Sequence, residues 1–349
     1  IINYNSKKSL NLKGIINIDN LDHKKVIKDR PTLGFIGAGN YGSRVLIPIF
    51  KRLNTNLDTI VTSGGINSSI QGKRHGFASA SSNIESIISN KSIDTVVIAT
   101  QHDTHAEYTE KLLLAGKNVF VEKPLAINNS ELEKLKKVYL EISKENKIPQ
   151  LMVGFNRRFA PHTMKMKKLI SNISEPKSII MTMNSGHIPS SHWTQNVKIG
   201  GGRIIGEACH YIDLMRFLVG KKITSFHAQK MGNNKSIGIT EDKTFITLNF
   251  EDGSHGVIIY LANGSNKFPK ERIEIFTAGK VLQLDNFIKL KGFGWKGFNK
   301  LNLWTQNKGQ LNCINSFIDS IQSGKPAIAI DELFEVAKVT IEIANSLRK

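Results

Sequence analysis

The chain has 349 residues, of which 40% are hydrophobic and 22% charged, a composition typical of a globular protein long enough for two domains. Its formal net charge is +19, but the lysines are spread from end to end without interleaved aromatic residues, which favours a solvated basic surface over nucleic-acid binding. The two cysteines, Cys209 and Cys313, match no metal-ligand spacing, and no apolar run approaches the roughly 20 residues that span a bilayer, so we expect a cytoplasmic protein without metal or membrane contact.

Residues 1–30 mix polar and charged residues with scattered isoleucines, and we interpret them as a leader or linker. From Pro31 onward, strand and helix patterns alternate. The predicted strands are 32–36, 59–62, 95–99, 118–121 and 150–155, and the predicted helices are 40–52, 68–75, 84–89, 104–115 and 130–146. Pro48 falls inside the first helix, where we expect a kink. Strands separated by helices predict a parallel sheet, so residues 31–155 are expected to form a Rossmann dinucleotide-binding domain.

The pattern changes after Phe155. Helices are predicted at 161–170 and 206–219, around a long loop, and β patterns follow at 223–231, 243–250, 254–262, 271–277 and 280–290. Two amphipathic helices, 311–322 and 331–347, end the chain, with Asp331 as the expected N-cap of the second. We therefore expect an α/β protein in which residues 156–349 form an α+β substrate-binding and oligomerisation domain with a large, mostly antiparallel open sheet. The last two helices are candidates to pack back on the first domain.

The strand at 32–36 runs directly into Gly37, Gly39 and Gly42, which are spaced at i, i+2 and i+5. Gly37 permits a tight turn, Gly39 lets the backbone approach a pyrophosphate, and Gly42 lets the following helix pack closely on the strand. A glycine-rich turn without a ligand would show the same spacing. The alternating strands and helices around it favour dinucleotide binding.

The end of the second strand predicts which dinucleotide binds. An acidic residue there takes the ribose hydroxyls of NAD, but this chain has Ser63 and Gly64. Arg74 follows within reach of a 2′-phosphate. The expected cofactor is therefore NADP or NAD, with NADP slightly favoured.

A second motif, Glu122-Lys123-Pro124, follows a later strand. A lysine at the carboxyl end of a parallel strand lies over the cofactor crevice, and the proline is a candidate for a cis peptide that fixes the turn. The ammonium of Lys123 can hydrogen-bond a substrate hydroxyl and exchange a proton with it. The alternative is a lysine on a surface turn.

A third motif runs from Gly200-Gly201-Gly202 into a helix that is predicted to begin near Gly206. Glu207, His210 and Asp213 recur every three residues along one stripe of that helix. This stripe faces either the nicotinamide, with a catalytic histidine, or the protein core, with a structural one.

These motifs, in this order, resemble the glucose-fructose oxidoreductase and inositol dehydrogenase family, Gfo/Idh/MocA, over residues 31–349. The resemblance rests on four segments: 37–42, 122–124, 156–159 and 210–213. It implies hydride transfer between a nicotinamide and a sugar, cyclitol or sugar derivative, and a homo-oligomer. Lys123 and His210 match the family's catalytic lysine and histidine, and Glu207 or Asp213 would orient the histidine. The implied cofactor-binding residues are Gly37, Gly39, Asn40, Tyr41, Gly42, Ser63, Gly64, Arg74, Thr100, His102, His105, Glu122 and Lys123.

Two departures from the family pattern concern the site. The family usually has an aspartate four residues before the histidine, where this chain has Gly206, and Glu207 comes one step later. The family's Thr-Pro-Asn turn is replaced by Thr100-Gln101-His102, although His105 stands where the family often has a histidine.

A narrower resemblance links segments 184–189, 192–193 and 200–210 to bacterial bi-domain oxidoreductases, in which a zinc-type alcohol dehydrogenase-like segment precedes this module. A chain that starts at Ile1 without methionine agrees with such an upstream segment. The substrate-binding residues that this resemblance implies are Arg158, Asn184, His187, His192, Trp193 and His210.

The predicted function is therefore that of an NAD(P)-dependent dehydrogenase or reductase acting on CH–OH groups. One alternative is a cofactor-binding sugar sensor, or a partner module of an upstream dehydrogenase, in which the change at Gly206 has altered catalysis. A further alternative is an NAD-dependent glycosidase.

Overall fold

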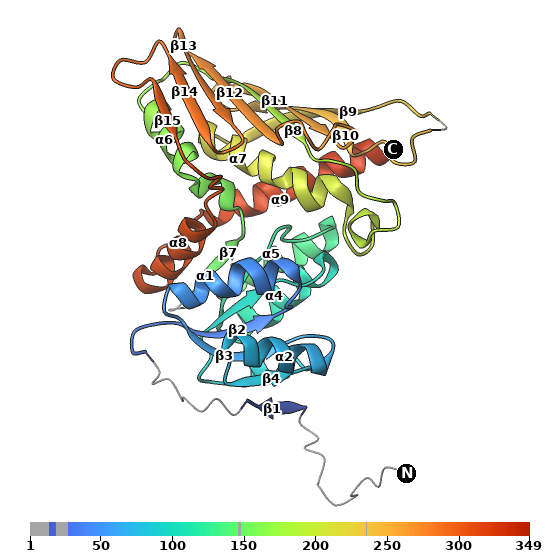
Figure 1. Ribbon diagram of the computed structural model, residues 1–349, viewed down its shortest axis with the longest axis vertical. Helices are drawn as coiled ribbons and strands as arrows, with labels where there is room; N and C mark the ends of the chain where they lie inside the picture. The colour runs from blue at the N-terminus through green and yellow to red at the C-terminus, as the bar shows by residue number, and fades with distance from the viewer. Residues whose placement is uncertain (1–13, 19–26, 146–147, 235) are drawn as a thin grey trace, which may run out of the picture.

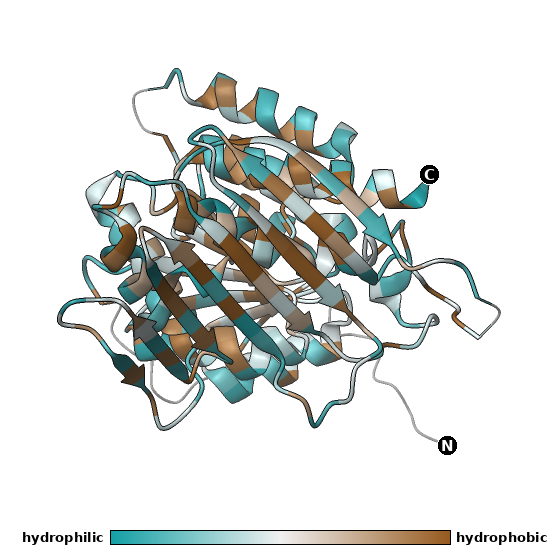
Figure 2. Ribbon diagram, turned by 90° about the horizontal axis from the view of Figure 1, so that it is seen from above, coloured by the Kyte–Doolittle hydropathy of each residue, from teal (hydrophilic) through white to brown (hydrophobic). Residues whose placement is uncertain are grey.

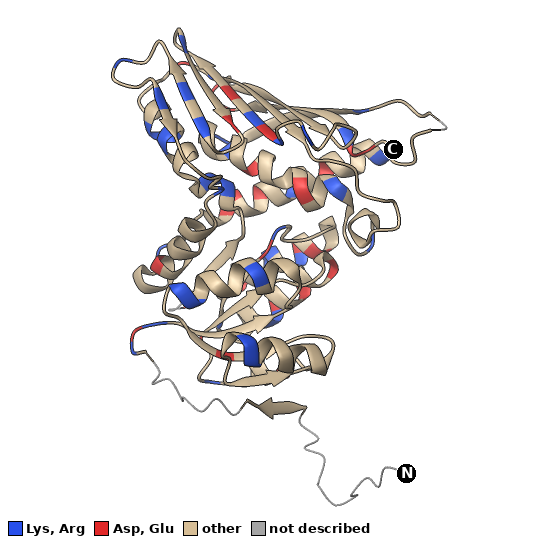
Figure 3. Cartoon of the chain, in the orientation of Figure 1, with Lys and Arg blue, Asp and Glu red and all other residues tan. Residues whose placement is uncertain are grey.

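The computed structural model describes residues 14–18, 27–145, 148–234 and 236–349. Figure 1 shows two parts, one above the other: an N-terminal Rossmann domain around a twisted sheet, and a C-terminal part in which a large sheet covers several helices. Lys and Arg are spread over both parts (Figure 3), in agreement with a solvated basic surface. Among the described residues, no helix is both long and apolar enough to cross a membrane.

The sheet of the Rossmann domain confirms the predicted parallel arrangement. Within the described residues it has seven strands, in the order β1 (Ile15–Asn17), β4 (Ser79–Ser81), β3 (Asn56–Val61), β2 (Thr32–Ile36), β5 (Thr95–Ile98), β6 (Asn118–Val121) and β7 (Leu151–Val153). Strands β2 to β7 are parallel, and β1 is antiparallel to β4. The sequence predicted neither β1 nor β4, because both are three-residue strands with little hydrophobic pattern.

The helices of this domain are α1 (Ile47–Arg52), α2 (Gly65–His75), α3 (Glu85–Ile88), α4 (His105–Leu114) and α5 (Asn129–Ile142). The helix expected over 40–52 is divided: Gly42–Leu46 is π-helical and only Ile47–Arg52 is α-helical. Pro48 is the second residue of α1, but the helical backbone continues without a break from Gly42–Leu46, so Pro48 lies inside a helical run, as predicted, and removes an N–H from it. The predicted irregularity therefore takes the form of a change of helix type ahead of the proline.

The second sheet lies on the side of the C-terminal part that faces away from the Rossmann domain, and Figure 2 shows it from above. Its strand order is β15 (Lys300–Asn302), β14 (Lys289–Phe293), β13 (Lys280–Asp285), β12 (Glu271–Thr277), β8 (Ser178–Asn184), β11 (His255–Leu261), β10 (Lys243–Phe250) and β9 (Ile223–Lys230). All neighbours are antiparallel except β8 and β11, which are parallel. Strand β8 lies in the centre of this sheet, although the sequence predicted a loop there.

The remaining helices are α6 (Pro161–Ile170), α7 (Cys209–Val219), α8 (Gln310–Ser323) and α9 (Ile330–Arg348). Helix α9 contacts α7 and β9 in the C-terminal part and also α5 and β7 in the Rossmann domain, so it ties the two parts together. The prediction that Asp331 is the N-cap of α9 is wrong, because Ala329 holds that position. Asp331 lies in the first turn, where its negative charge interacts favourably with the helix dipole.

Candidate active site

A cleft of about 1380 Å³ lies between the two parts. Gly37 follows β2, Thr100 follows β5 and Glu122 follows β6, so the carboxyl ends of three neighbouring parallel strands form one wall. The start of α7 supplies the opposite wall with Gly206, Glu207 and His210. Single small ligands occupy roughly 300–1,000 Å³, so this cleft has room for a dinucleotide together with a second molecule.

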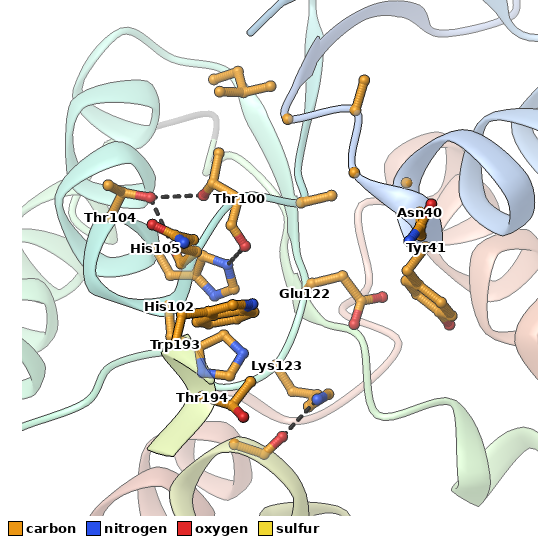
Figure 4. A pocket seen from close by; sticks show the side chains of 18 of the residues that line it. Asn40, Tyr41, Thr100, His102, Thr104, His105, Glu122, Lys123, Trp193 and Thr194 are labelled. Carbon is orange, nitrogen blue, oxygen red and sulfur yellow. Dashed lines mark hydrogen bonds between the residues drawn. The ribbon is translucent and has the colours of Figure 1, made fainter. Parts of the chain in front are cut away.

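The glycine loop lines this cleft with the open geometry that a dinucleotide requires. Gly37 has a φ of 90°, and its N–H donates to the carbonyl of Val61 (2.8 Å). A Cβ at Gly39 would have no atom within 4 Å, whereas a Cβ at Gly42 would lie 3.0 Å from the carbonyl oxygen of Gly37. Asn40 and Tyr41 line the cleft beside them (Figure 4). The loop therefore offers free backbone on the cleft side and close packing on the other, which fits a pyrophosphate.

The far end of the cleft, beyond β3, is lined by neutral side chains. They are Val61, Thr62, Ser63, Asn67, Ser82, Asn83 and Ile84. Two expected contacts are absent from the described lining: Gly64, whose carbonyl accepts from Thr62 Oγ1 (2.7 Å), and Arg74, which is exposed in the last turn of α2. The arginine predicted to bind a 2′-phosphate therefore lies outside the described cleft lining, in the exposed last turn of α2.

Lys123 lies at the centre of the cleft wall. It follows β6, the Lys123–Pro124 peptide is cis, and its Nζ donates to the carbonyl of Gly206 (2.5 Å) across the cleft. Glu122 beside it is buried. Burial raises the pKa of Glu122 to about 7, although Lys123 and Arg157 act in the opposite direction.

The shifted pKa of Glu122 predicts a pH-dependent stability difference. Because the folded-state pKa is about 7 and the ordinary value is about 4.5, the folded state binds the proton more tightly. The stability that the protonated form contributes is complete below pH 4.5 and is lost as the pH rises through 7. We therefore expect the free energy of unfolding of the native protein, relative to that of Glu122→Gln, to fall by about 3 kcal/mol between pH 4.5 and 8. Urea unfolding of both proteins across this range measures the difference, and a constant difference would contradict the assignment.

Two histidines on the β5 side are buried and neutral. His105 Nδ1 donates to the carbonyl of Pro124 (2.8 Å), which ties α4 to the Lys123–Pro124 turn, and burial lowers the pKa of His105 to about 4. His102 Nδ1 donates to the carbonyl of Gly200 (2.8 Å), and burial, with Lys123, lowers the pKa of His102 to about 3. The Trp193 ring packs edge-on against His102, with 4.8 Å between centroids (Figure 4).

His102 occupies the space in front of Gly206. A Cβ at position 206 would lie 2.9 Å from His102 Cε1. The two departures from the family pattern are therefore one feature: the histidine in the β5 turn fills the space that a side chain at position 206 would need.

This packing predicts coupling between positions 102 and 206. Gly206→Ala is expected to lower the free energy of unfolding by about 1–3 kcal/mol, because a methyl group is forced against a buried ring. In a His102→Ala background the same change should cost less, since the ring is gone. Urea titration of the single and double variants gives the coupling energy. Additive effects would show that the contact does not constrain position 206.

His210 lies in the cleft wall supplied by the start of α7. It is buried, and among the described residues its Nδ1 has no hydrogen-bond partner. Burial, followed by Arg157 and Lys123, lowers the pKa of His210 well below its usual value. The Phe155 ring lies edge-on to it, with 6.1 Å between centroids. The imidazole is therefore held in its neutral form.

Neither predicted orienting carboxylate reaches His210. Glu207 lines the cleft, but it binds Arg203 (2.5 Å), Tyr260 (2.7 Å) and Lys270 (2.8 Å). Asp213 forms a buried ion pair with Arg158 outside the described cleft lining, because one further turn of α7 carries its side chain into the core. Burial raises the pKa of Asp213 to about 6 against the effect of Arg158.

Four of the predicted substrate-binding residues lie outside the described cleft lining. Arg158 is committed to Asp213 and Glu332. Asn184 Nδ2 donates to the carbonyls of Ser265 (2.8 Å) and Phe268 (3.3 Å) and so holds a loop. His187 is exposed. His192 is also exposed and is the N-cap of the short 3-10 helix Trp193–Gln195, where its Nδ1 accepts from the Thr194 N–H. Trp193 and His210 do line the cleft.

Four cations that line the cleft were not predicted from the sequence: Arg157, Arg203, Lys270 and Lys308. Arg157 belongs to the 156–159 motif, but alternation along a chain does not show which of two adjacent arginines faces a ligand. Lys270 and Lys308 lie in loops before β12 and α8, where the sequence carries no motif.

Comparison with known proteins agrees with this architecture. A profile described as oxidoreductase family, NAD-binding Rossmann fold, matches residues 32–155, and one described as GFO/IDH/MocA C-terminal domain matches residues 163–280. The chain is 28% identical over 253 residues to inositol 2-dehydrogenase of Rhizobium meliloti (strain 1021), across 69% of this chain and 74% of that protein. Myo-inositol 2-dehydrogenase of Thermotoga maritima is 24% identical over 69% of this chain and 73% of that protein. A levoglucosan dehydrogenase solved with NADH and levoglucosan superposes with a TM-score of 0.76, over 91% of this chain and 98% of that chain; at 21% identity this likeness shows the fold alone.

Proposed function

Because the chain belongs to the Gfo/Idh/MocA family of oxidoreductases, we propose that it is an NAD(P)-dependent dehydrogenase or reductase acting on a CH–OH group of a sugar, cyclitol or sugar derivative. The observation that carries the proposal is a single cleft that brings the glycine loop, Lys123 and His210 together. The inositol dehydrogenases among its relatives support the substrate class.

The residues of the cleft divide into a cofactor end and a substrate end. Gly39, Asn40 and Tyr41 would hold the pyrophosphate, and the neutral side chains around Ser63 would contact the adenosine half. When bound, the nicotinamide supplies the hydride acceptor or donor. Lys123 donates a hydrogen bond to the reacting oxygen of the substrate, and the neutral His210 accepts the hydroxyl proton in oxidation and returns it in reduction.

NADP remains slightly favoured over NAD in this proposal. Among the described residues that line the far end of the cleft there is no carboxylate to repel a 2′-phosphate. Arg74 is not placed to bind that phosphate, so we expect a preference of no more than about tenfold.

Several finer proposals accompany this function. We propose a boundary between the two domains near residue 155, and a cytoplasmic homo-oligomer that pairs through the outer face of the large sheet seen in Figure 2. The motif in residues 184–210 supports an upstream alcohol dehydrogenase-like segment as a partner. A sensor without catalysis is the main alternative, because neither Glu207 nor Asp213 bonds His210.

The experiment that tests the function is calorimetric binding of NADPH, NADH and their oxidised forms, followed by addition of neutral sugars, uronates and cyclitols while nicotinamide absorbance is recorded. Turnover with any member supports the dehydrogenase. Tight cofactor binding without turnover across the panel favours the sensor. Release of a free sugar without net change in absorbance indicates a glycosidase.

A further inference from the structure

The substrate end of the cleft contains an ion cluster in which two cations share one carboxylate. Arg157 donates to Glu271 from Nη2 (2.9 Å) and Nε (3.2 Å), and Lys308 Nζ donates to Oε1 of the same carboxylate (2.7 Å). Glu271 is 2% exposed and lies behind the two cations, which line the cleft. We call these three residues the Glu271 cluster.

A second cluster has the same composition. Arg203 Nη2 donates to Glu207 Oε2 (2.5 Å), and Lys270 Nζ donates to Oε1 (2.8 Å). The Tyr260 hydroxyl donates to Oε2 as well (2.7 Å) but adds no charge. Arg203, Lys270 and Glu207 all line the cleft, and we call them the Glu207 cluster.

Each cluster has one positive charge more than its carboxylate neutralises. Both carboxylates are ionised at neutral pH. Although burial acts in the opposite direction, Arg157 and Lys308 lower the pKa of Glu271 to about 2, and Lys270 and Arg203 hold the pKa of Glu207 below its usual range. The two clusters together therefore place two uncompensated positive charges at the substrate end.

The lysines are the members that can meet a ligand. The side chain of Lys270 is 37% exposed and that of Lys308 is 16% exposed, whereas Arg157 and Arg203 are nearly buried. An ammonium group has three donors, but among the described residues each of these two lysines donates to a single carboxylate oxygen. Each therefore has donors left for a group in the cleft.

The positive charges of the two clusters also act on His210. After burial, the groups that lower the pKa of His210 are Arg157, Lys123, Lys308 and Lys270, so both clusters act on this imidazole. A neutral polyol would leave that excess charge in a partly desolvated cleft, which is unfavourable. An anionic group on the substrate would neutralise it through charge-assisted hydrogen bonds.

We propose that the substrate is an acidic sugar derivative whose carboxylate or phosphate is bound by the ammonium groups of Lys270 and Lys308. This inference rests on the proposed function and narrows its substrate class. A carboxylate and a phosphate share the required chemistry, a compact anion with several acceptor oxygens, and the test separates them.

The test is calorimetric measurement of ligand binding to the full chain. The chain is first saturated with NADH or NADPH, whichever binds more tightly in the cofactor experiment. The ligands are glucose, glucuronate, glucose 1-phosphate and glucose 6-phosphate, which compare one neutral sugar with one carboxylate and two phosphates. We expect at least one acidic ligand to bind about tenfold or more tightly than glucose. Lys270→Gln and Lys308→Gln should each reduce that preference by about tenfold. Lys338→Gln on α9 removes the same charge from an exposed lysine outside the described cleft lining, and should leave the preference unchanged.

Three outcomes would overturn the proposal: glucose binds as tightly as the acidic ligands, none of the acidic ligands binds, or both lysine variants keep the preference. Thermal unfolding of each variant shows whether the fold is retained. Because binding is measured without turnover, anion binding in a protein that transfers no hydride would count against the dehydrogenase and not against the anion site. Hydride transfer to neutral sugars alone would support the dehydrogenase and count against the anion site.

Discussion

Lys123→Met is expected to reduce kcat by about a thousandfold while leaving nicotinamide binding within a few-fold of the native value. Methionine keeps the length of the side chain but removes the ammonium, which lines the cleft and donates to the carbonyl of Gly206. The glycine loop is on a different strand end, so the cofactor contacts proposed for Gly39 and Asn40 should be unchanged. Steady-state kinetics on the substrate found with the ligand panel, together with calorimetry of the cofactor, measure the two effects separately.

Lys123→Arg is the matched control for this variant. Arginine retains the positive charge and the hydrogen-bond donors, but it does not release a proton near neutral pH. If the lysine acts as an acid and base, Lys123→Arg should be nearly as inactive as Lys123→Met. If it acts only by charge, the arginine variant should keep substantial activity. Turnover within tenfold of the native protein in Lys123→Met would remove Lys123 from the mechanism.

The parts of this structure that the sequence predicted best are those fixed by local chemistry. The glycine loop and the parallel sheet follow from residue types and an alternation of elements that few other conformations accommodate. Strand β8 was not predicted, because its two neighbours, β11 and β12, are formed by residues more than 70 positions later in the chain. A central strand whose pairing is entirely long-range leaves little local signal.

The candidate site shows the same division. Lys123 and His210 follow from their motifs and line one cleft, although their roles stay predictions. Asp213 belongs to the motif of His210 and Arg158 to the 156–159 motif, yet the two side chains pair with each other in the core. A motif gives the residue types and their spacing but not the rotation of each element against its neighbours. The two ion clusters combine residues from four separate segments, one of which is the start of strand β12, and only the folded chain brings them together.

Alanine substitutions at two glycines of the glycine loop are expected to have different effects, one on stability and the other on cofactor affinity. Gly37→Ala is expected to lower the free energy of unfolding by more than about 3 kcal/mol. Its φ of 90° is a conformation that alanine rarely adopts, and the added Cβ would lie 2.6 Å from the carbonyl carbon of Ala99 and 2.9 Å from the backbone nitrogen of Thr100. Because both contacts are backbone atoms at the end of β5, neither can move away without distorting the sheet.

Gly39→Ala adds the same methyl group two residues later, where it would have no atom within 4 Å. The free energy of unfolding should therefore change by less than about 0.5 kcal/mol. The methyl group would instead occupy the cleft where the backbone is expected to approach the pyrophosphate, so affinity for NADH and NADPH should fall by about tenfold or more. Urea titration and calorimetry on the two variants distinguish a fold defect from a ligand defect. If Gly39→Ala binds both cofactors normally, the pyrophosphate does not lie against this loop, and the cofactor end of the cleft must be assigned elsewhere.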